Sequence, residues 1–249
     1  MSLQNWLQNR VTLSRLMMLA ICCSLAVLNS NSPSADDKSS TKETDWKSLF
    51  DGKTLKNWKS TNFGGEGEVS VKDGKIVMKQ GSDMTGITWT GEALHTMNYE
   101  VSLMAQRIEG SDFFCGLTFK VNDDPCSLII GGWGGGVVGI SSLNGLDAAN
   151  NETVRFETFK RGEWYKIRLR VSEKGLMAWI DDKQVVSVDT KGKKISIRGE
   201  VEPSLPFGIS CYATEAGLKE IKIRKLAEEE AKDALTPVDE AEETTTKQK

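Results

Sequence analysis

The chain has 249 residues, of which 39% are hydrophobic and 27% charged, and its formal net charge is −3. This length suffices for one large β domain or two small domains, and the slight negative charge argues against nucleic acid as a partner. The acidic excess lies in residues 227–249, so the rest of the chain is close to neutral and suits an uncharged ligand.

Residues 1–35 have the pattern of an export signal. Arg10 and Arg15 precede an apolar run, Leu16–Leu28, which has the length of a signal-peptide h-region, and small residues follow it. The run is too short to span a bilayer comfortably, so no stable membrane span is expected in the mature chain. A lipoprotein signal is the less favoured alternative, because Leu19–Cys22 lacks the small residue expected directly before the cysteine. We therefore expect an exported protein, either periplasmic or secreted.

Three segments follow the export signal. Residues 36–44 form a polar linker, and residues 45–226 form one segment of the size of a β-sandwich. Residues 227–249 are acidic, rich in threonine and free of aromatic residues. This composition predicts a disordered tail that carries a frayed helix at most. The oligomeric state stays open.

The central segment alternates between apolar and polar residues. This is the pattern of strands that turn one face to a core and the other to water or a ligand. A hairpin is expected across the turn Asp181–Lys183. The expected strands include 99–106, 165–172, 176–180, 184–188, 205–212 and 218–225. Since no long helical stripe interrupts them, the predicted fold class is all-β, a sandwich of two antiparallel sheets.

Three cysteines remain after the export signal: Cys115, Cys126 and Cys211. An exported protein can form disulfides, and an odd number of cysteines then leaves one thiol unpaired. Three buried free thiols are nearly as favoured, so the sequence leaves the pairing open.

A stretch rich in glycine and free of charges, IIGGWGGGVVGISS, occupies residues 129–142. It does not fit a phosphate-binding loop, because strand-like residues follow Gly136 where such a loop has Lys-Ser or a helix. In one interpretation the glycines let strands bend or cross closely. In the other, the missing side chains leave a floor of bare backbone for a sugar ring, with Trp133 as its wall.

Several motifs of the domain resemble a known family. DWKSLFDGKTLKNWKS, residues 45–60, is similar to the W-x-x-LF-x-G-x-x-L-x-x-W opening of the 3-keto-disaccharide hydrolase domain. The likeness extends from Trp46 to Leu226 and ends with LPFGIS and LKEIKIRKL. It is also carried by residues 71–78, 99–119 and 162–189.

The resemblance implies a concanavalin A-like jelly-roll sandwich and an exported enzyme that acts on glycosides oxidised to a ketone at C3. The ketone acidifies the proton on C2, so a base can remove it, the C1 leaving group departs, and water adds to the resulting glucal. Such a site needs a base tuned near neutrality and donors, or a metal, for the enolate oxygen. The turn Asn122–Asp124 lacks the ligand count of a calcium loop. We therefore expect no cofactor, with a divalent metal such as calcium as the alternative.

The chain departs from the family pattern in two stretches. Commoner members carry GYE-x-Q-x-x-D where this sequence has CSLIIGGWGGGVVGISSLNG, and they carry Q-D-H-G where it has GISCYATEAG. The single histidine also excludes a metal site built on several histidines. A non-catalytic, lectin-like carbohydrate-binding module and a cell-surface adhesion module are therefore alternatives to an enzyme.

The candidate catalytic residues are three acids. Glu100 lies on the polar face of its strand, Asp112 lies in a loop before the strand of Cys115, and Asp147 follows the glycine-rich stretch. Each also has a structural interpretation, as a solvated side chain or a turn cap. An enzyme requires that such candidates converge on one concavity.

The candidate substrate-binding residues combine aromatic rings with polar groups. Trp133 is expected to stack on a sugar, and Asn144 to hydrogen-bond its hydroxyls. Arg168 and Arg170 share one strand face, and Trp179 is expected on a neighbouring strand, so the three can stabilise an enolate. A ladder of surface ion pairs is the favoured structural alternative. These residue types predict a neutral carbohydrate as the ligand.

Overall fold

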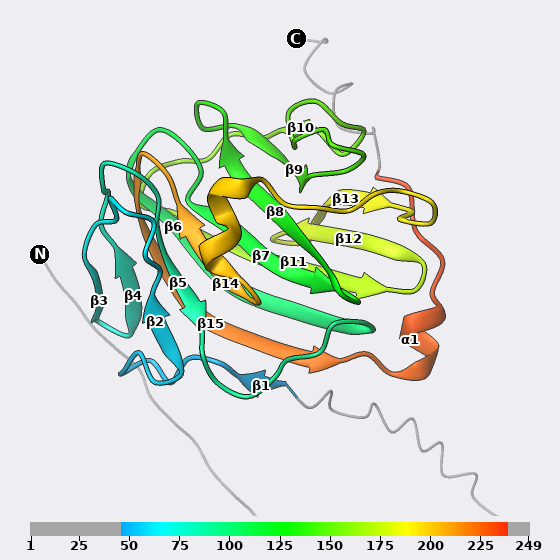
Figure 1. Cartoon of the computed structure of the whole chain (residues 1–249), viewed down its shortest axis with the longest axis horizontal. Helices are drawn as coiled ribbons and strands as arrows, with labels where there is room; N and C mark the ends of the chain where they lie inside the picture. Colours follow the sequence, from blue (N-terminus) through cyan, green and yellow to red (C-terminus); the bar gives the residue numbers. More distant parts are fainter. Residues whose placement is uncertain (1–45, 239–249) are drawn as a thin grey trace, which may run out of the picture. The chain divides into compact units, whose positions relative to one another are not determined.

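The structure, a computed structural model, describes residues 46–238, which form two facing antiparallel β-sheets (Figure 1). Sheet A has eight strands, of which β1 (Lys47–Ser48) pairs with β15 outside the main order. The main order of sheet A is β13 (Lys183–Val188), β12 (Gly175–Ile180), β11 (Trp164–Ser172), β6 (Tyr99–Gly110), β15 (Thr214–Lys225), β4 (Lys75–Met78) and β3 (Val69–Lys72). Sheet B has seven strands, in the order β10 (Arg155–Phe156), β9 (Val137–Ser141), β8 (Asp124–Gly132), β7 (Cys115–Val121), β14 (Gly208–Cys211), β5 (Thr85–Trp89) and β2 (Trp58–Ser60).

The predicted all-β sandwich is confirmed, and so is the alternation that predicted it. On β6 the residues Val101, Leu103 and Ala105 are fully buried between the sheets, and on β11 Ile167 and Leu169 are as well. Burying these alternate residues removes apolar surface from water and holds the two sheets together. The expected hairpin is also present, as β12 and β13 around a turn at Asp181 and Asp182.

The opening motif of the domain is part of this core. The indole Nε1 of Trp58 donates a hydrogen bond to the carbonyl oxygen of Leu49 at 2.7 Å. Its ring packs edge-to-face on Trp89 at a centroid distance of 5.2 Å, and Phe50 is buried nearby. The motif therefore helps to close one end of the sandwich core.

Glycines of sheet B lie beneath other parts of the chain. A Cβ atom added to Gly208 would approach the carbonyl oxygen of Ser204, in the 3₁₀ helix η1 (Gly199–Ser204), to 2.7 Å. One added to Gly139 would approach the Thr153 hydroxyl to 3.0 Å. Glycine is needed at these positions because backbone and loops pack directly on the sheet. The outer face of sheet B is therefore covered in part by η1 and by the β9–β10 connection.

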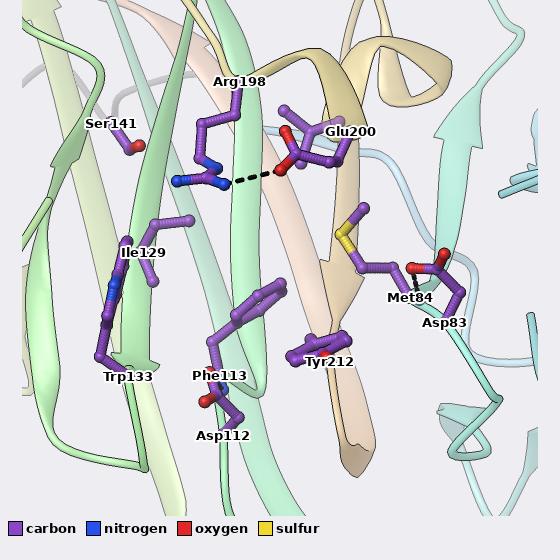
Figure 2. Close-up of a pocket in the computed structure, with 11 residues that line it drawn as sticks. Asp83, Met84, Asp112, Phe113, Ile129, Trp133, Ser141, Arg198, Glu200 and Tyr212 are labelled. Carbon is purple, nitrogen blue, oxygen red and sulfur yellow. Dashed lines mark hydrogen bonds and ion pairs between the residues drawn. The ribbon is translucent and has the colours of Figure 1, made fainter. Parts of the chain in front are cut away.

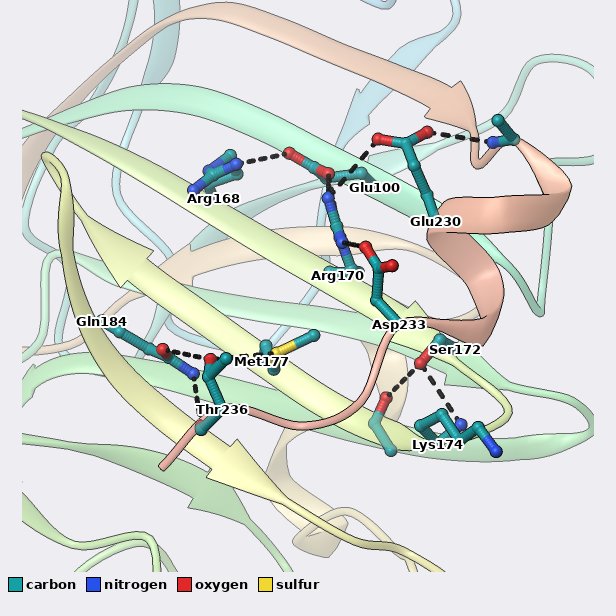
Figure 3. Close-up of polar contacts among 12 residues, drawn as sticks. Glu100, Arg168, Arg170, Ser172, Lys174, Met177, Gln184, Glu230, Asp233 and Thr236 are labelled. Carbon is teal, nitrogen blue, oxygen red and sulfur yellow. Dashed lines mark hydrogen bonds and ion pairs between the residues drawn. The ribbon is translucent and has the colours of Figure 1, made fainter. Parts of the chain in front are cut away.

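The C-terminal segment packs on the outer face of sheet A (Figure 3). Helix α1 (Glu228–Lys232) places Glu230 against Arg224, whose guanidinium donates to both carboxylate oxygens at 2.7 Å. These hydrogen bonds lower the pKa of Glu230 to about 2. Further on, the Thr236 hydroxyl lies 2.8 Å from the Gln184 side chain. The expectation of disorder from residue 227 onward is wrong for residues 227–238, because carboxylates of this segment meet arginines of the sheet.

The three cysteines of the domain are free and buried. Burial raises the pKa of the Cys211 thiol to about 12, and it raises those of Cys115 and Cys126 as well. Since the thiolate is the reactive form, all three side chains act as small apolar core residues. Of the two interpretations left open by the sequence, the structure has the one with free thiols.

We expect these thiols to be unreactive in the folded protein. Ellman's reagent at mildly alkaline pH should label none of the three in native protein within an hour, and all three after denaturation in guanidinium chloride. Cys115, Cys126 and Cys211 replaced one at a time by Ala serve as controls that assign the denatured signal. A total of one thiol in denatured, unreduced protein would instead mean that a disulfide has formed.

No helix within residues 46–238 is long and apolar enough to cross a membrane. The predicted export signal and linker, residues 1–44, lie outside the described residues, as do residues 239–249.

Candidate functional site

A pocket of about 400 Å³ lies on the sheet B side of the sandwich (Figure 2). Its walls come from the chain before β5 and β7, from β8 and the β8–β9 turn, from the end of β9, from η1 and from the β14–β15 turn. The volume is in the range of pockets that hold a small ligand. The lining residues are Asp83, Met84, Asp112, Phe113, Ile129, Trp133, Ser141, Arg198, Glu200, Val201 and Tyr212.

Three aromatic rings line the pocket. Phe113 and Tyr212 stack on each other, with ring centroids 6.1 Å apart and planes 27° apart. Trp133 enters from the β8–β9 turn, and 44% of its surface is exposed, against 45% for Tyr212. Half-exposed rings of this kind can cover the apolar C–H faces of a sugar while its hydroxyls reach polar groups.

Asp112 holds the turn that carries Trp133. One carboxylate oxygen accepts a hydrogen bond from the backbone N–H of Gly134 at 2.9 Å, and the other from the N–H of Phe113 at 2.8 Å. Trp133 itself has a φ of 49°, in the left-handed region that costs energy for a bulky residue. The carboxylate therefore lies in the pocket and also fixes the turn beside it.

A buried arginine supports the same two loops from below. Arg107, on β6, is 5% exposed and has no carboxylate within ion-pair distance among the described residues. Its guanidinium donates to the carbonyl oxygens of Gly135 at 2.9 Å and of Gly131 and Asp112 at 3.1 Å. It also lies over the Phe114 ring at 5.2 Å. Burial lowers the pKa of Arg107, and the carbonyls replace the water that it loses.

The opposite end of the pocket carries an ion-pair network. The Arg198 guanidinium lies 2.6 Å from a carboxylate oxygen of Glu200 (Figure 2). It also lies 3.5 Å from a carboxylate oxygen of Asp147. The hydrogen bond to Glu200 lowers the pKa of that carboxyl and raises the pKa of Arg198. Arg198 therefore stays charged at the pocket and is available to a ligand oxygen.

The hydroxyl of Ser141 lies beside the same pocket. Ser141 is 2% exposed, and its Oγ makes no hydrogen bond within the described part of the chain. A buried polar group without a partner is costly. This Oγ has almost no accessible surface, so the hydroxyl lies behind the pocket wall and is not open to the pocket.

The candidates from the sequence divide into two groups. Asp112 and Trp133 line the pocket, and Asp147 reaches it through Arg198. Asn144 lies in the same β9–β10 connection, but its side chain accepts a hydrogen bond from the backbone of Lys194 at 2.9 Å and does not line the pocket.

The second group lies on the outer face of sheet A, away from the pocket (Figure 3). Glu100 is 1% exposed and pairs with Arg224 at 2.8 Å, Arg170 at 3.1 Å and Arg168 at 3.3 Å. Arg168 also stacks on Trp179 at 4.1 Å. The expectation that Glu100 faces water or a ligand is wrong, because arginines of β11 and β15 cover it. Glu100 and the three arginines form a network of ion pairs, and Trp179 packs on one of these arginines. This arrangement fits the structural alternative.

The glycine-rich stretch does not form a bare floor. No glycine lines the pocket, so this expectation is wrong. Gly131 and Gly135 adopt positive φ angles and wrap the Arg107 guanidinium, which a Cβ atom on Gly131 would approach to 2.6 Å. The glycines thus shape a tight turn, and the hollow beside Trp133 is floored by side chains.

Sequence reasoning missed most of the pocket wall. Tyr212 lies in GISCYATEAG, and Ile129, Trp133 and Ser141 lie in CSLIIGGWGGGVVGISSLNG. The two stretches that depart from the family pattern therefore meet in one pocket. Their departure from the pattern could have been used to predict that they line the same site. Arg198 lies directly before η1 and Glu200 lies within it. No sequence motif marked either residue.

A metal site is not evident in the described part of the chain. No group of three or more His, Cys, Asp or Glu side chains in residues 46–238 is arranged to hold an ion. The turn Asn122–Asp124 joins β7 to β8 and contributes no residue to the pocket.

Comparisons with known proteins identify the family and the fold of the chain. The family model of the 3-keto-alpha-glucoside-1,2-lyase-like domain matches residues 45–224. No curated protein sequence is significantly similar to the chain.

Solved structures share the fold at low sequence identity. The Crh5 transglycosylase in complex with NAG is 12% identical, with a TM-score of 0.51 over 73% of this chain and 84% of that one. The carbohydrate-binding module CBM66 from Bacillus subtilis is 10% identical, with a TM-score of 0.46 over 68% of this chain and 96% of that one. These likenesses concern the jelly-roll fold alone.

Proposed function

The chain belongs to the family of 3-keto-alpha-glucoside-1,2-lyase-like domains, and from this premise we propose that it is an exported protein that acts on 3-keto-glycosides in the pocket beside Trp133. The observation that carries the proposal is the meeting of three aromatic rings, a carboxylate and an arginine around one hollow. Rings and planar polar groups are the partners that a neutral sugar requires. The export signal suggested by residues 1–35 supports a location in the periplasm or outside the cell.

The pocket supplies the groups that elimination and hydration need. Asp112 is the acid best placed to accept the proton from C2, because backbone N–H groups hold its carboxylate at the pocket. Arg198 is a charged donor for the enolate oxygen that develops at C3. The C1–O bond then breaks, the departing oxygen takes up the proton that Asp112 removed from C2, and water adds across the glucal double bond to give the free 3-keto-sugar. Asp147 acts through Arg198 as a positioning residue.

A non-catalytic carbohydrate-binding module is the second candidate. It is favoured by the side chains that the two divergent stretches bring to the pocket, since Ile129, Ser141 and Tyr212 carry no charge. A pocket of this kind can bind a sugar by stacking and hydrogen bonding, with its carboxylates acting as hydrogen-bond acceptors and without proton transfer. Replacing Trp133 by Ala should weaken binding about tenfold in either case.

Replacing Asp112 by Asn separates the two candidates. For an enzyme, turnover of a 3-keto-disaccharide should fall at least about 100-fold, because the amide cannot accept the C2 proton. Binding of the same sugar is measured beside turnover, because the amide can accept only one of the two backbone hydrogen bonds that hold the turn of Trp133; a loss of turnover far larger than the loss of affinity identifies the enzyme. Product release is followed by mass spectrometry, and proton removal by deuterium uptake at C2 in heavy water.

The matched control is Asp123→Asn, in the exposed β7–β8 turn, which should leave turnover and deuterium uptake unchanged. Binding without turnover or deuterium uptake in the unaltered protein would establish the binding module instead. The absence of both binding and turnover would rule out both candidates.

A further inference from the structure

The outer face of sheet A carries four cations in two adjacent rows of the strand register. In one row, Lys166 on β11 and Lys219 on β15 lie on either side of Met104 on β6. In the next row, Arg168 and Lys222 flank the β6 residue two positions earlier. Directly opposed residues of antiparallel strands point to the same face, as do residues two apart on one strand. We call these four cations the basic cluster.

The basic cluster lies on the solvent side of sheet A and is accessible. Ile167, between two of its members, is fully buried in the core, so the cations beside it point outward. Lys166 is exposed, and the other three cations are half-buried, as is Met104 at their centre. Since neighbouring strands lie about 4.8 Å apart and each residue rises about 3.4 Å, the cluster measures about 10 Å across β6 and about 7 Å along it.

Carboxylates leave most of the basic cluster without neutralisation. Among the described residues, Lys166 and Lys222 have no carboxylate within 4.0 Å, and Lys219 has only Glu220, at 4.0 Å. Arg168 shares its carboxylate partner with two other arginines. Like charges at such distances repel one another. An anion held among these cations would therefore be stabilised.

Indole rings hold three of the four cations in place. The Nζ atom of Lys219 lies 4.4 Å from the ring centroid of Trp164, and that of Lys222 lies 5.0 Å from the ring centroid of Trp46. Arg168 stacks in the same way on a third indole. These cation–π contacts restrict the side chains before any ligand arrives. Binding therefore costs less side-chain entropy than it would on free surface lysines.

A hollow of about 400 Å³ opens beside the two lysines of the basic cluster. It lies where β15 has a bulge, with β4 paired on one side of the bulge and β1 on the other. Trp46, Lys219 and Lys222 line it, together with the acids Asp51 and Glu220. The Asp51 carboxylate accepts hydrogen bonds from two backbone N–H groups of its own turn, at 2.7 and 2.8 Å, and pairs with neither lysine. The hollow thus offers a ligand an indole ring and two cations.

The adjoining part of the same face already binds carboxylates. Arg224 lies 2.7 Å from a carboxylate oxygen of Glu230, and Arg170 lies 3.3 Å from one of Asp233, both in the C-terminal segment (Figure 3). The basic cluster differs because its lysines stand beside indole rings. A carboxylate or sulfate carried on a sugar ring brings a charge for the lysines and an apolar C–H face for Trp46. A peptide carboxylate brings the charge alone.

We propose that the basic cluster and the adjoining hollow form a second binding site, which takes an acidic polysaccharide bearing carboxylate or sulfate groups. This site goes beyond the function proposed for the pocket, because it lies on the other sheet and requires no 3-keto-sugar. It would hold the protein on an acidic polysaccharide while the pocket binds its own neutral ligand.

The test is a calorimetric titration of the full chain with three sugars of equal length: an oligogalacturonate, a sulfated malto-oligosaccharide and the unmodified malto-oligosaccharide. Both anionic sugars should bind more tightly than the neutral one. Replacing Lys219 and Lys222 together by Gln should weaken their binding about tenfold and leave neutral-sugar binding unchanged. Raising the salt from about 0.1 M to about 1 M should weaken it as well, because the Debye length falls from about 10 Å to about 3 Å.

Two controls separate this site from net charge and from the pocket. Replacing Lys191 and Lys194 together by Gln removes the same charge from exposed positions in the loop after β13, and it should leave the affinity for the anionic sugars unchanged. Trp133→Ala should weaken binding in the pocket and leave binding of the anionic sugars intact. The second site and the proposed function can therefore fail separately.

Each contrary result overturns the proposal in a different way. An equal loss in the Lys191 and Lys194 control would assign the binding to net charge. Equal affinity for polyglutamate or for single-stranded DNA would make the occupant an acidic peptide or a nucleic acid. Absence of binding by both anionic sugars would exclude the site, and binding that appears only after Asp239, Glu240, Glu242 and Glu243 are replaced by their amides would make these residues of the chain the occupant.

Discussion

Replacing Glu100 by Gln is expected to lower the free energy of unfolding by about 3 kcal/mol, as the loss of one partner from a buried ion-pair network does. Glu100 is 1% exposed, and Arg224 and Arg170 beside it are nearly buried as well. The amide carries no charge, so the three guanidinium groups lose the carboxylate that they share. The measurement is denaturation in urea, followed by circular dichroism.

The control for Glu100 lies on the same strand. Glu109, also on β6, pairs with Arg161 at 3.3 Å, and both side chains are mostly exposed. Glu109→Gln should change the stability by less than about 0.5 kcal/mol, because surface ion pairs contribute little. A Glu100→Gln protein that keeps its stability and loses turnover would contradict the assignment made here. It would make Glu100 a catalytic base and move the site to sheet A.

Replacing Arg107 by Met is expected to cost about 3 kcal/mol of stability and to loosen the pocket. The variant leaves the carbonyl oxygens of Asp112, Gly131 and Gly135 buried without their donor. Because these carbonyls belong to the loops that carry Asp112 and Trp133, sugar affinity should fall about tenfold or more in protein that is still folded. Arg107 is a positioning residue in this account, since it does not line the pocket.

Two further measurements separate this role from a general loss of stability. Amide hydrogen exchange should accelerate at residues 131–136 more than in β11 or β15. Arg107→Lys should keep the buried charge but make fewer hydrogen bonds, and its affinity should lie between the two. The control Arg161→Met, at an exposed arginine, should change neither exchange nor affinity. Uniform acceleration of exchange in Arg107→Met would argue that Arg107 stabilises the sandwich without shaping the site.

The family resemblance and the structure answer different questions. The conserved-looking opening around Trp58 is recognisable because it closes the core, so it predicts the fold and is silent about the site. The segments that differ from the family pattern lie at the pocket. The fold is thus what the family match shows, while the pocket lining is known from the structure of this chain.

The sequence by itself determined the strands and the class of the fold. Alternation with a period of two assigns Val101, Leu103, Ile167 and Leu169 to a core face, and turn residues such as Asp181 mark the hairpins. These are local signals, since they depend on neighbours along the chain.

Only the tertiary structure decided what the polar faces meet. Glu100 and Asp112 are both polar residues next to strand residues, but Glu100 is buried by arginines of β11 and β15, while Asp112 lies in a pocket with η1 and the β14–β15 turn. Consecutive strands β14 and β15 even belong to different sheets. Alternation fixes the face on which a side chain lies, but the pairing of distant strands determines what covers that face. The pocket therefore depends on contacts that no local pattern encodes.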